Sequence, residues 1–347
     1  MKICNTQNNN PTKKLPVMKN YTDVYTEYKK IIDKILSTSI QKQTPETLYK
    51  PLKYLLDGGG KRIRPVLLIF ACEAAGGKME DAVNASVAIE LLHNFTLVHD
   101  DIMDNADTRR GRLTIHNKWN TNVAILSGDH LIGMAYTYLL KTDSERLGEI
   151  ARTFTDGIIE VCEGQSYDKE FESRKDVTVE EYIMMIGKKT AKMLETSALI
   201  GAIIGKGSAE MMLNLKEYSS NLGIAFQILD DLLDITSTEK ELGKKIGGDL
   251  VEGKKTFILL KALELVKERN DLSKLYYIIE HNGLENNEDE QIAGIKYIFE
   301  KHGVIDYAKK EIEKYTERAD NSLNKIPGSE SRDRLKWFSN MLMSRSF

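Results

Sequence analysis

Proline is absent from most of this chain, and its absence constrains the fold more than any other feature. The six prolines stand at positions 11, 16, 45, 51, 65 and 327, so residues 66–326 contain none. Because proline costs about 3 kcal/mol inside a helix, such a stretch is typical of continuous helical structure. Apolar residues recur every three or four positions over 82–104 and 211–235, and alternating strand patterns are nearly absent. We therefore predict an all-α fold, a bundle of about a dozen helices with no dividing linker.

Length and charge limit the classes of protein and of partner. The chain has 347 residues, of which 41% are hydrophobic, and its 52 acidic side chains nearly balance 49 basic ones. This balance gives no overall attraction for nucleic acid or for an anionic membrane, so we expect no nucleic-acid partner. No apolar run reaches the roughly 18 residues that a spanning helix needs, so we expect no stable membrane insertion.

The beginning of the chain does not look like a targeting segment. Residues 1–19 have neither the apolar segment of a secretory signal nor the arginine content of a transit peptide. We interpret them as a disordered tail, with Met18 as an alternative start, followed by one helical domain over 20–347. The three cysteines, Cys4, Cys72 and Cys162, are odd in number and follow no pattern. They favour a reducing compartment, and we expect the cytoplasm.

Two clusters of aspartates close two of the predicted helices. Both have the form Asp-Asp-x-x-Asp: one contains Asp100, Asp101 and Asp104, and the other contains Asp230, Asp231 and Asp234. In a helix, residues i and i+4 lie about 40° apart around the axis, so the first and last aspartate of each cluster share a face. Two carboxylates about 5 Å apart repel by about 3 kcal/mol at an effective dielectric of 20. A helix C-terminus adds an unfavourable dipole, so we expect positive groups nearby.

A solvated helix end is the simplest explanation of one such cluster. Two copies, each after an apolar stretch and each followed by basic residues, favour a functional site. Carboxylates with no His or Cys at ligand spacing suit Mg²⁺, which binds phosphate oxygens beside its protein ligands. Two facing clusters would therefore hold several Mg²⁺ ions and a polyphosphate. An alternative is a di-iron bundle, which needs two Glu-x-x-His segments. Only His93, after Glu90, has a glutamate three positions before it, which disfavours that alternative.

Basic residues gather in four segments. They are Lys61, Arg62 and Arg64 after three glycines, Arg109 and Arg110, Lys188 and Lys189, and the set Lys244, Lys245, Lys254 and Lys255. The first segment is not a P-loop, because it lacks the first glycine and the hydroxyl after the lysine. Each segment alone is weak, and "GKKTAKM" is explained most simply as an exposed helical face. Together they indicate two anionic groups, one bridged to aspartates through Mg²⁺ and one bound directly by Lys and Arg.

Taken in order, these motifs resemble those of the trans-type isoprenyl diphosphate synthases, the polyprenyl synthetase family. The matching segments are "GGGKRIRP", "ELLHNFTLVHDDIMDNADTRRG", "GKKTA", "GIAFQILDDLLDI" and "LGKKIGGDLVEGKKT". The resemblance implies antiparallel helices around a deep central cavity, and a homodimer. It also implies that an allylic diphosphate, held by about three Mg²⁺ ions between the aspartate clusters, loses its diphosphate. The double bond of isopentenyl diphosphate then attacks the allylic cation.

The same resemblance assigns roles to individual residues. Metal ligands are expected at Asp100, Asp104 and Asp230, with help through water from Asp231 and Asp234. The isopentenyl diphosphate pocket is expected at Lys61, Arg64, His93 and Arg110. The allylic diphosphate is expected beside Arg109, Lys189 and Lys254, with Lys244 nearby. Polar oxygens that steady the cation are expected at Thr190 and Gln227. Helix geometry supports one pairing independently, because His93 lies two turns before Asp100 on nearly the same face.

Product length in this family depends on side chains just before the first aspartate cluster, which form the cavity floor. Phe95 is the fifth residue before Asp100 and Thr96 is the fourth. This combination most resembles geranylgeranyl (C20) synthases, and the alternatives are C15 farnesyl and C25 or longer products. On an ideal helix Phe95 lies about 140° from Asp100, so its place in the floor rests on the resemblance, and packing against a neighbouring helix is the alternative.

Two functions from other classes stay open at this point. A class I terpene cyclase would share the metal-triggered ionisation but would not need a second diphosphate pocket, which Lys61, Arg64 and Arg110 supply here. A non-catalytic partner subunit would lack one aspartate cluster, whereas this chain has both.

Overall fold

Almost all of the described chain is helical, which confirms the predicted all-α fold. The computed structural model describes residues 20–237, 246–284 and 288–344, so the predicted tail over 1–19 lies outside the described residues. The helices are α1 (Tyr21–Thr38), α2 (Glu46–Leu56), α3 (Ile63–Ala74), α4 (Met79–Met103), α5 (Ile115–Lys118), α6 (Thr121–Leu139), α7 (Leu147–Ser173), α8 (Val179–Ile186), the π-helix η1 (Gly187–Ala191), α9 (Lys192–Ile204), α10 (Ala209–Thr236), α12 (Gly248–Val251), α13 (Phe257–Leu265), α14 (Arg269–His281), α15 (Glu288–Lys301), α16 (Val304–Asn324) and α17 (Glu330–Ser344). Two short strands, β1 (Thr108–Arg109) and β2 (Arg112–Leu113), pair antiparallel.

Local sequence signals set several helix boundaries. Pro65 lies in the first turn of α3, where a missing backbone N–H removes no helical hydrogen bond, and Pro327 separates α16 from α17. Pro51 is the exception, because it lies inside α2. The Ser208 side chain caps α10 by accepting a hydrogen bond from a backbone N–H of its first turn. Thr178 caps α8 in the same way, and a glutamate three residues later completes a capping box.

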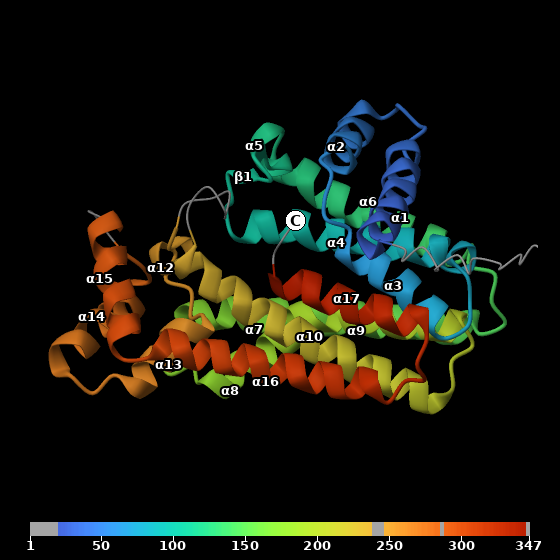
Figure 1. Ribbon diagram of the computed structural model, residues 1–347. Helices are drawn as coiled ribbons and strands as arrows, with labels where there is room; N and C mark the ends of the chain where they lie inside the picture. Colours follow the sequence, from blue (N-terminus) through green and yellow to red (C-terminus); the bar gives the residue numbers. More distant parts are fainter. Residues whose placement is uncertain (1–19, 238–245, 285–287, 345–347) are drawn as a thin grey trace, which may run out of the picture.

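The long helices α4, α7, α10 and α16 run roughly along one direction, and α14 and α15 stand at one end of the bundle (Figure 1). Helix α4 packs against α3, α6 and α9, and α10 packs against α9 and α16. Residues 85–92 of α4 are all buried, which is expected of a helix that other helices surround. The core therefore holds the two helices that carry the aspartate clusters firmly in place, and both clusters lie toward the C-terminal ends of these helices.

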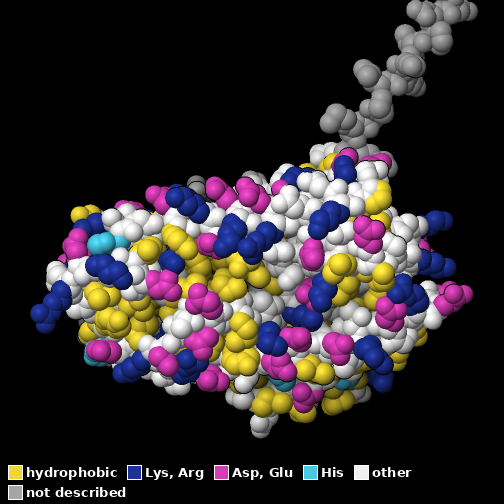
Figure 2. Space-filling view, turned by 90° about the horizontal axis from the view of Figure 1, so that it is seen from below, with side chains coloured by type: hydrophobic (Ala, Val, Ile, Leu, Met, Phe, Trp, Pro, Cys, Tyr) yellow, Lys and Arg dark blue, Asp and Glu magenta, His cyan; other side chains and the backbone are white. Residues whose placement is uncertain are grey.

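The surface mixes charges of both signs, as the balanced composition predicts. Figure 2 shows Lys and Arg side chains interspersed with Asp and Glu side chains over the face seen from below, with hydrophobic side chains between them. Within the described ranges, we find no helix whose length and apolar character would let it cross a membrane.

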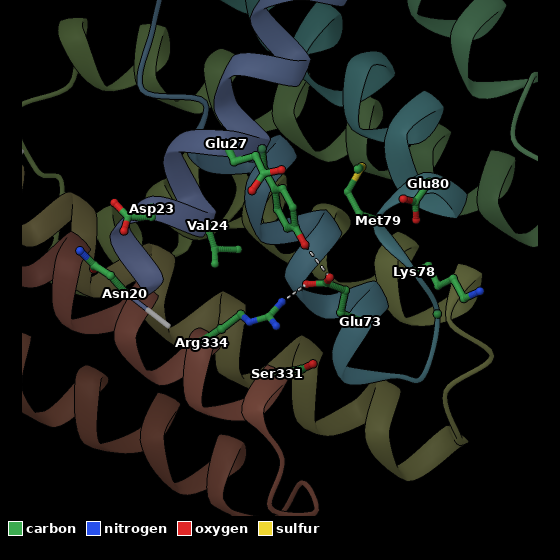
Figure 3. A pocket seen from close by; sticks show the side chains of 12 residues that line it. Asn20, Asp23, Val24, Glu27, Glu73, Lys78, Met79, Glu80, Ser331 and Arg334 are labelled. Atoms are coloured by element: carbon green, nitrogen blue, oxygen red, sulfur yellow. Dashed lines mark hydrogen bonds and ion pairs between the residues drawn. The ribbon is translucent and has the colours of Figure 1, made fainter. Parts of the chain in front are cut away.

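The carboxylate of Glu73, at the end of α3, joins two distant parts of the chain. It accepts a hydrogen bond from the Tyr28 hydroxyl of α1 at 2.6 Å. It also pairs with the Arg334 guanidinium of α17 at 2.7 Å (Figure 3). The Arg334 and Glu73 side chains are only 11% and 15% exposed, so little solvent weakens their attraction. This contact fastens the first and last described helices to α3.

We expect Glu73→Ala to lower the free energy of unfolding by about 2 kcal/mol, because it removes two hydrogen bonds and leaves the largely buried Arg334 with less compensation. Denaturant unfolding followed by circular dichroism measures this change. Glu27→Ala is the matched control, since Glu27 is exposed at the same hollow (Figure 3), and its effect should stay within about 0.5 kcal/mol. Equal effects of the two substitutions would contradict a stabilising role of the contacts that Glu73 makes with α1 and α17.

Candidate active site

The first aspartate cluster lies at the C-terminal end of α4, where cations from other elements compensate it. Asp104 is the C-cap residue, and its Oδ1 lies 2.7 Å from Lys169 Nζ of α7. Asp100 Oδ1 lies 3.5 Å from Lys189 Nζ of η1, and no described residue donates a hydrogen bond to this buried atom. Burial raises the pKa of Asp104, but the bond from Lys169 and the charges of Lys254 and Lys189 lower this pKa by more. Asp104 therefore stays ionised.

The short hairpin explains why arginines follow the aspartates in the sequence. At its turn, Arg110 and Gly111 have φ values of 54° and 70°, the left-handed values that a two-residue hairpin turn needs. Arg109 lies on the first strand and contacts α4, where its Nε donates to Asp101 Oδ1 and its Nη2 lies 4.0 Å from Asp100 Oδ2. The predicted compensation of the aspartates by nearby positive charge is therefore present in the fold.

The residues predicted to hold isopentenyl diphosphate gather around the glycine turn before α3. Arg64 Nη1 lies 3.1 Å from His93 Nε2, and because a guanidinium only donates, this nitrogen of His93 accepts. Burial and the charges of Arg64 and Arg110 hold the pKa of His93 far below its usual value, so the imidazole is neutral. Arg110 donates to the backbone oxygen of Gly59 at this turn, and Lys61 is exposed beside it.

Glu90 and His93 do not form an iron-binding pair. The Glu90 carboxylate accepts a hydrogen bond from Arg62 Nη1 at 2.5 Å, and both side chains are 2% exposed. His93 contacts Arg64 instead. The buried arginine satisfies the glutamate, which explains why a carboxylate lies inside α4 without a metal. The di-iron alternative is therefore wrong.

The π-helix η1 turns Lys189 and Thr190 toward the site, in agreement with the frequent use of π-helical turns at functional sites. Lys189 Nζ pairs with Asp168 of α7 at 2.6 Å, in addition to its contact with Asp100. Thr190 Oγ1 donates to Gln227 Oε1 of α10 at 3.0 Å. The structure thus brings together the two residues predicted to steady a cation. An exposed helical face, the simplest interpretation of this segment, is wrong for Lys189 and Thr190.

The three aspartates of the second cluster lie in different environments. Asp231 is buried, and its carboxylate accepts hydrogen bonds from Tyr182, Gln227 and the backbone of Phe257. Burial and the neighbouring Asp249 raise the pKa of Asp231 to about 8. Asp234 is also buried, and its Oδ2 accepts a hydrogen bond from the Asp249 backbone at 3.1 Å. Asp230 is half-buried, so it has the most accessible carboxylate of the cluster.

Lys254, after α12, links the first aspartate cluster electrostatically to the segment that follows α10. Its Nζ lies 2.6 Å from Glu252 and 3.9 Å from Asp249. Burial lowers the pKa of Lys254, but the carboxylates of Asp249, Glu252 and Asp104 raise it by more, so its charge is retained. The influence of Asp104 places the end of α4 and the segment after α10 around one site. Lys244, predicted nearby, falls outside the described residues.

A cavity of about 510 Å³ opens beside the end of α4. Its polar lining consists of Arg64, His93, Thr96, His99, Asp100, Gln165, Ser166, Lys169, Lys189 and Thr190, and its apolar lining consists of Phe95, Leu97, Met103, Val161, Cys162 and Met193. On α7, Lys169 lies about 12 Å along the axis from Val161, and on α4 Asp100 lies more than a turn from Phe95. On each of these two helices, the charged residue and the apolar residue that line the cavity are therefore more than one turn apart. Phe95 and Thr96 line this cavity, and Phe95 is only 7% exposed.

Two charged residues of the site, Asp168 and Lys169, were missed by sequence reasoning. They bond Lys189 and Asp104, respectively, and so complete the surroundings of the first cluster. In "GQSYDKEF" they look like ordinary charged residues of a helix surface, and nothing in their spacing sets them apart. The packing of α7 against η1 gives Asp168 its partner, and the approach of α7 to the end of α4 gives Lys169 its partner.

Two glycines let neighbouring helices approach η1 closely. A Cβ atom at Gly164 of α7 would lie 2.4 Å from the backbone nitrogen of Lys189. A Cβ atom at Gly223 of α10 would lie 2.5 Å from the Cα atom of Ala191. Both contacts are with backbone, which cannot rotate away as a side chain can. The positions of Lys189 and Thr190 therefore depend on the absence of side chains at Gly164 and Gly223.

We expect Gly164→Ala to lower turnover about 10- to 100-fold and the free energy of unfolding by about 1–3 kcal/mol, because η1 must move away from α7. Steady-state kinetics and thermal unfolding measure the two effects. Gly148→Ala is the control on the same helix, since a Cβ atom there meets no described atom within 4 Å. If both alanine variants behave alike, close packing at η1 does not position Lys189.

Known proteins resemble this chain in sequence. The sequence pattern of the polyprenyl synthetase family matches residues 45–295. A short chain isoprenyl diphosphate synthase of Methanothermobacter thermautotrophicus is 38% identical, over 93% of this chain and 98% of that protein. A geranylgeranyl diphosphate synthase of Saccharolobus solfataricus is 42% identical, over 82% of this chain and 85% of its own length.

Solved structures resemble the fold over nearly its full length. The crystal structure of geranylgeranyl pyrophosphate synthetase from Pyrococcus horikoshii Ot3 is 35% identical and superposes with a TM-score of 0.87. The match covers 94% of this chain and 99% of that structure. The resemblance that the motifs indicated is confirmed by sequence, over most of the chain, and by fold. The chain belongs to the polyprenyl synthetase family and is a prenyltransferase enzyme.

Proposed function

We propose that this enzyme joins isopentenyl diphosphate head-to-tail to an allylic diphosphate and releases a trans-polyprenyl diphosphate, with C20 geranylgeranyl diphosphate as its main product. The observation that carries the proposal is one cavity, with Asp100, Lys169 and Lys189 at its charged end and Phe95 in its apolar part. A diphosphate fits the charged end, and a growing hydrocarbon chain fits the apolar part. The names of the two geranylgeranyl synthases to which this chain is similar support the C20 length.

The carboxylates of the two clusters fit Mg²⁺. Asp100 offers a buried oxygen that accepts no hydrogen bond from any described residue, and Asp104 is held ionised. Asp230 is the most accessible carboxylate of the second cluster, and Asp234 lies about one turn further along α10. Mg²⁺ is commonly bound by one or two carboxylates together with substrate phosphates, and about three ions would neutralise the leaving diphosphate.

A second group of acidic and histidine ligand atoms does not suit a cation. Within the described ranges, atoms of Glu268, Asp271 and His302 lie within 4.8 Å of one another. Lys301 Nζ pairs with both carboxylates and already supplies their positive charge. We therefore place the metal ions at the aspartate clusters only.

The chain's own cations would hold the two diphosphates apart. Arg109, Lys189 and Lys254 surround the first cluster and suit the allylic diphosphate. Arg64, Arg110, Lys61 and the neutral His93 stand at the glycine turn and suit isopentenyl diphosphate without a metal. Thr190 lines the cavity beside Lys189 and donates a hydrogen bond to Gln227, and the oxygens of these two side chains would stabilise a developing cation.

We also propose that residues 20–347 form one domain that assembles as a homodimer in the cytoplasm. The contact of Glu73 with Arg334 supports one domain, because it ties α17 to α3. Exposed apolar side chains on α6, Ile125 and Leu126, support a face that a second copy covers. Light scattering after size-exclusion chromatography measures the mass in solution. The small number of cysteines supports a reducing compartment such as the cytoplasm.

The proposed reaction is tested with purified protein, Mg²⁺, isopentenyl diphosphate and each of three allylic primers of five, ten and fifteen carbons. We expect consumption of isopentenyl diphosphate and a C20 product on chromatography. A main product of C15 or of C25 and above would correct the length. Hydrocarbons formed without consumption of isopentenyl diphosphate would favour a terpene cyclase instead, and no turnover with any primer would favour a partner subunit.

A further inference from the structure

His99 stands directly beneath Phe95 in the wall of the cavity. The two residues are one helical turn apart on α4, so their side chains share a face. Their rings meet edge to face, with centroids 4.7 Å apart and planes at 67°. Both rings line the cavity, and Phe95 is nearly buried. The imidazole therefore occupies the volume into which the Phe95 ring would otherwise turn.

Helix α6 holds the imidazole in this place from the other side. His99 Nε2 lies 3.3 Å from the backbone oxygen of Ile125 and 3.9 Å from Asp129 Oδ1. A Cβ atom at Gly128 would lie only 2.2 Å from the same Nε2. The imidazole thus packs against the backbone of α6 at Gly128, which carries no side chain. Glycine is unfavourable inside a helix, and this contact is a physical reason for it here.

A second glycine of α6 shows that this crowding is local. Gly133 lies five residues after Gly128 on the same helix, and a Cβ atom there would meet no atom of the described residues within 4 Å. The same substitution at the two positions therefore changes helix propensity equally but moves His99 only in one case. This makes Gly133 a matched control for Gly128.

We propose that His99 is a positioning residue for product length: wedged between Gly128 of α6 and the ring of Phe95, it fixes how deep the cavity is. His99 acts on the product length through Phe95, whose ring it contacts. The inference rests on the proposed function, because it assumes that the prenyl chain grows toward Phe95.

The arrangement gives the two substitutions opposite effects. In His99→Ala the space beside Phe95 is empty, so the phenyl ring can turn into it and the cavity becomes deeper. In Gly128→Ala the new methyl group displaces the imidazole from α6 toward the cavity, which becomes shallower. In His99→Phe a ring of similar size still supports Phe95, although it makes no hydrogen bond to Ile125.

The experiment measures the product lengths made by the full chain and four variants with isopentenyl diphosphate, Mg²⁺ and a farnesyl primer. We expect His99→Ala to raise the share of product longer than the wild type's main product by about tenfold. We expect Gly128→Ala to raise the share of shorter product by a similar factor, and His99→Phe and Gly133→Ala to match the wild type. Because the readout is the ratio of products, a change in total turnover does not affect it.

Several outcomes would overturn the inference: unchanged product ratios in His99→Ala and Gly128→Ala, equal ratios in Gly128→Ala and Gly133→Ala, or longer products from Gly128→Ala. A wild-type main product other than C20 would correct the proposed product length, but the changes in product ratio expected of the variants would stay the same. The second measurement is calorimetry of the binding of geranyl, farnesyl and geranylgeranyl thiolodiphosphates in the presence of MgCl₂. The affinity should fall only at a longer prenyl chain in His99→Ala than in the wild type. If the two proteins show the same dependence on prenyl chain length, the role of His99 is contradicted, even if the protein makes no product.

Discussion

Asp104→Ala is expected to lower turnover by at least about a thousandfold, roughly 4 kcal/mol in activation free energy, while the helices stay folded. Asp104 is held ionised at the end of α4, and its carboxylate is one of the negative groups proposed to hold Mg²⁺. Its backbone N–H bonds the carbonyl of Asp100, and alanine keeps that bond. Lys169 keeps its ion pair with Glu172, so the loss of its partly exposed pair with Asp104 costs about 1 kcal/mol or less of stability.

The control for this substitution is Asp107→Ala, three residues further on. Asp107 is exposed, and its carboxylate accepts a hydrogen bond from Asn117, away from the cations of the site. Its turnover should stay within a factor of about three of the wild type. Circular dichroism verifies the fold of both variants. The metal role of Asp104 is wrong if its alanine variant keeps wild-type turnover at saturating Mg²⁺.

Phe95→Ala is expected to lengthen the main product by at least one five-carbon unit. The phenyl ring is nearly buried and lines the apolar part of the cavity, so its removal opens space in front of the growing chain. Part of the ring faces the cavity rather than packed atoms, so the loss of stability should fall below the 3–5 kcal/mol typical of a fully packed phenylalanine. Product chromatography measures the length.

Phe95→Trp is the matched variant in the opposite direction. A larger ring at the same place should shift the product toward C15, because it fills more of the cavity. If neither variant changes the distribution of products, Phe95 only packs against its neighbours and the floor lies elsewhere. Thermal unfolding of both variants separates a change of cavity shape from a general loss of stability.

The fold follows from the sequence because its signals are local and agree with one another. The absence of proline between residues 65 and 327 predicts long helices, and capping residues such as Ser208 and Thr178 stand where α10 and α8 begin. The hairpin after α4 could not be predicted in the same way. Its turn needs a left-handed Arg110, a conformation that arginine rarely adopts and that the surrounding contacts impose.

The same distinction applies to the candidate site: some of its residues can be identified from the sequence, and others cannot. Both aspartate clusters and their basic neighbours can be identified from the sequence, because residues four apart share a helical face and concentrated like charge needs compensation. The sequence could not identify Lys169 and Asp168, whose partners belong to other helices. It also could not show that Asp231 and Asp234 bond their own surroundings while Asp230 stays more accessible.

What the sequence determines by itself is therefore the helical fold, the family and the kinds of group that the reaction needs. Only the tertiary structure decides which of those groups meet and how deep the cavity is. The reason is physical: a helix follows from contacts between residues three or four apart, whereas the place of His99 depends on a missing side chain at Gly128, twenty-nine residues further along the chain. Such a contact has no periodic trace in the sequence and exists only once α4 and α6 have packed.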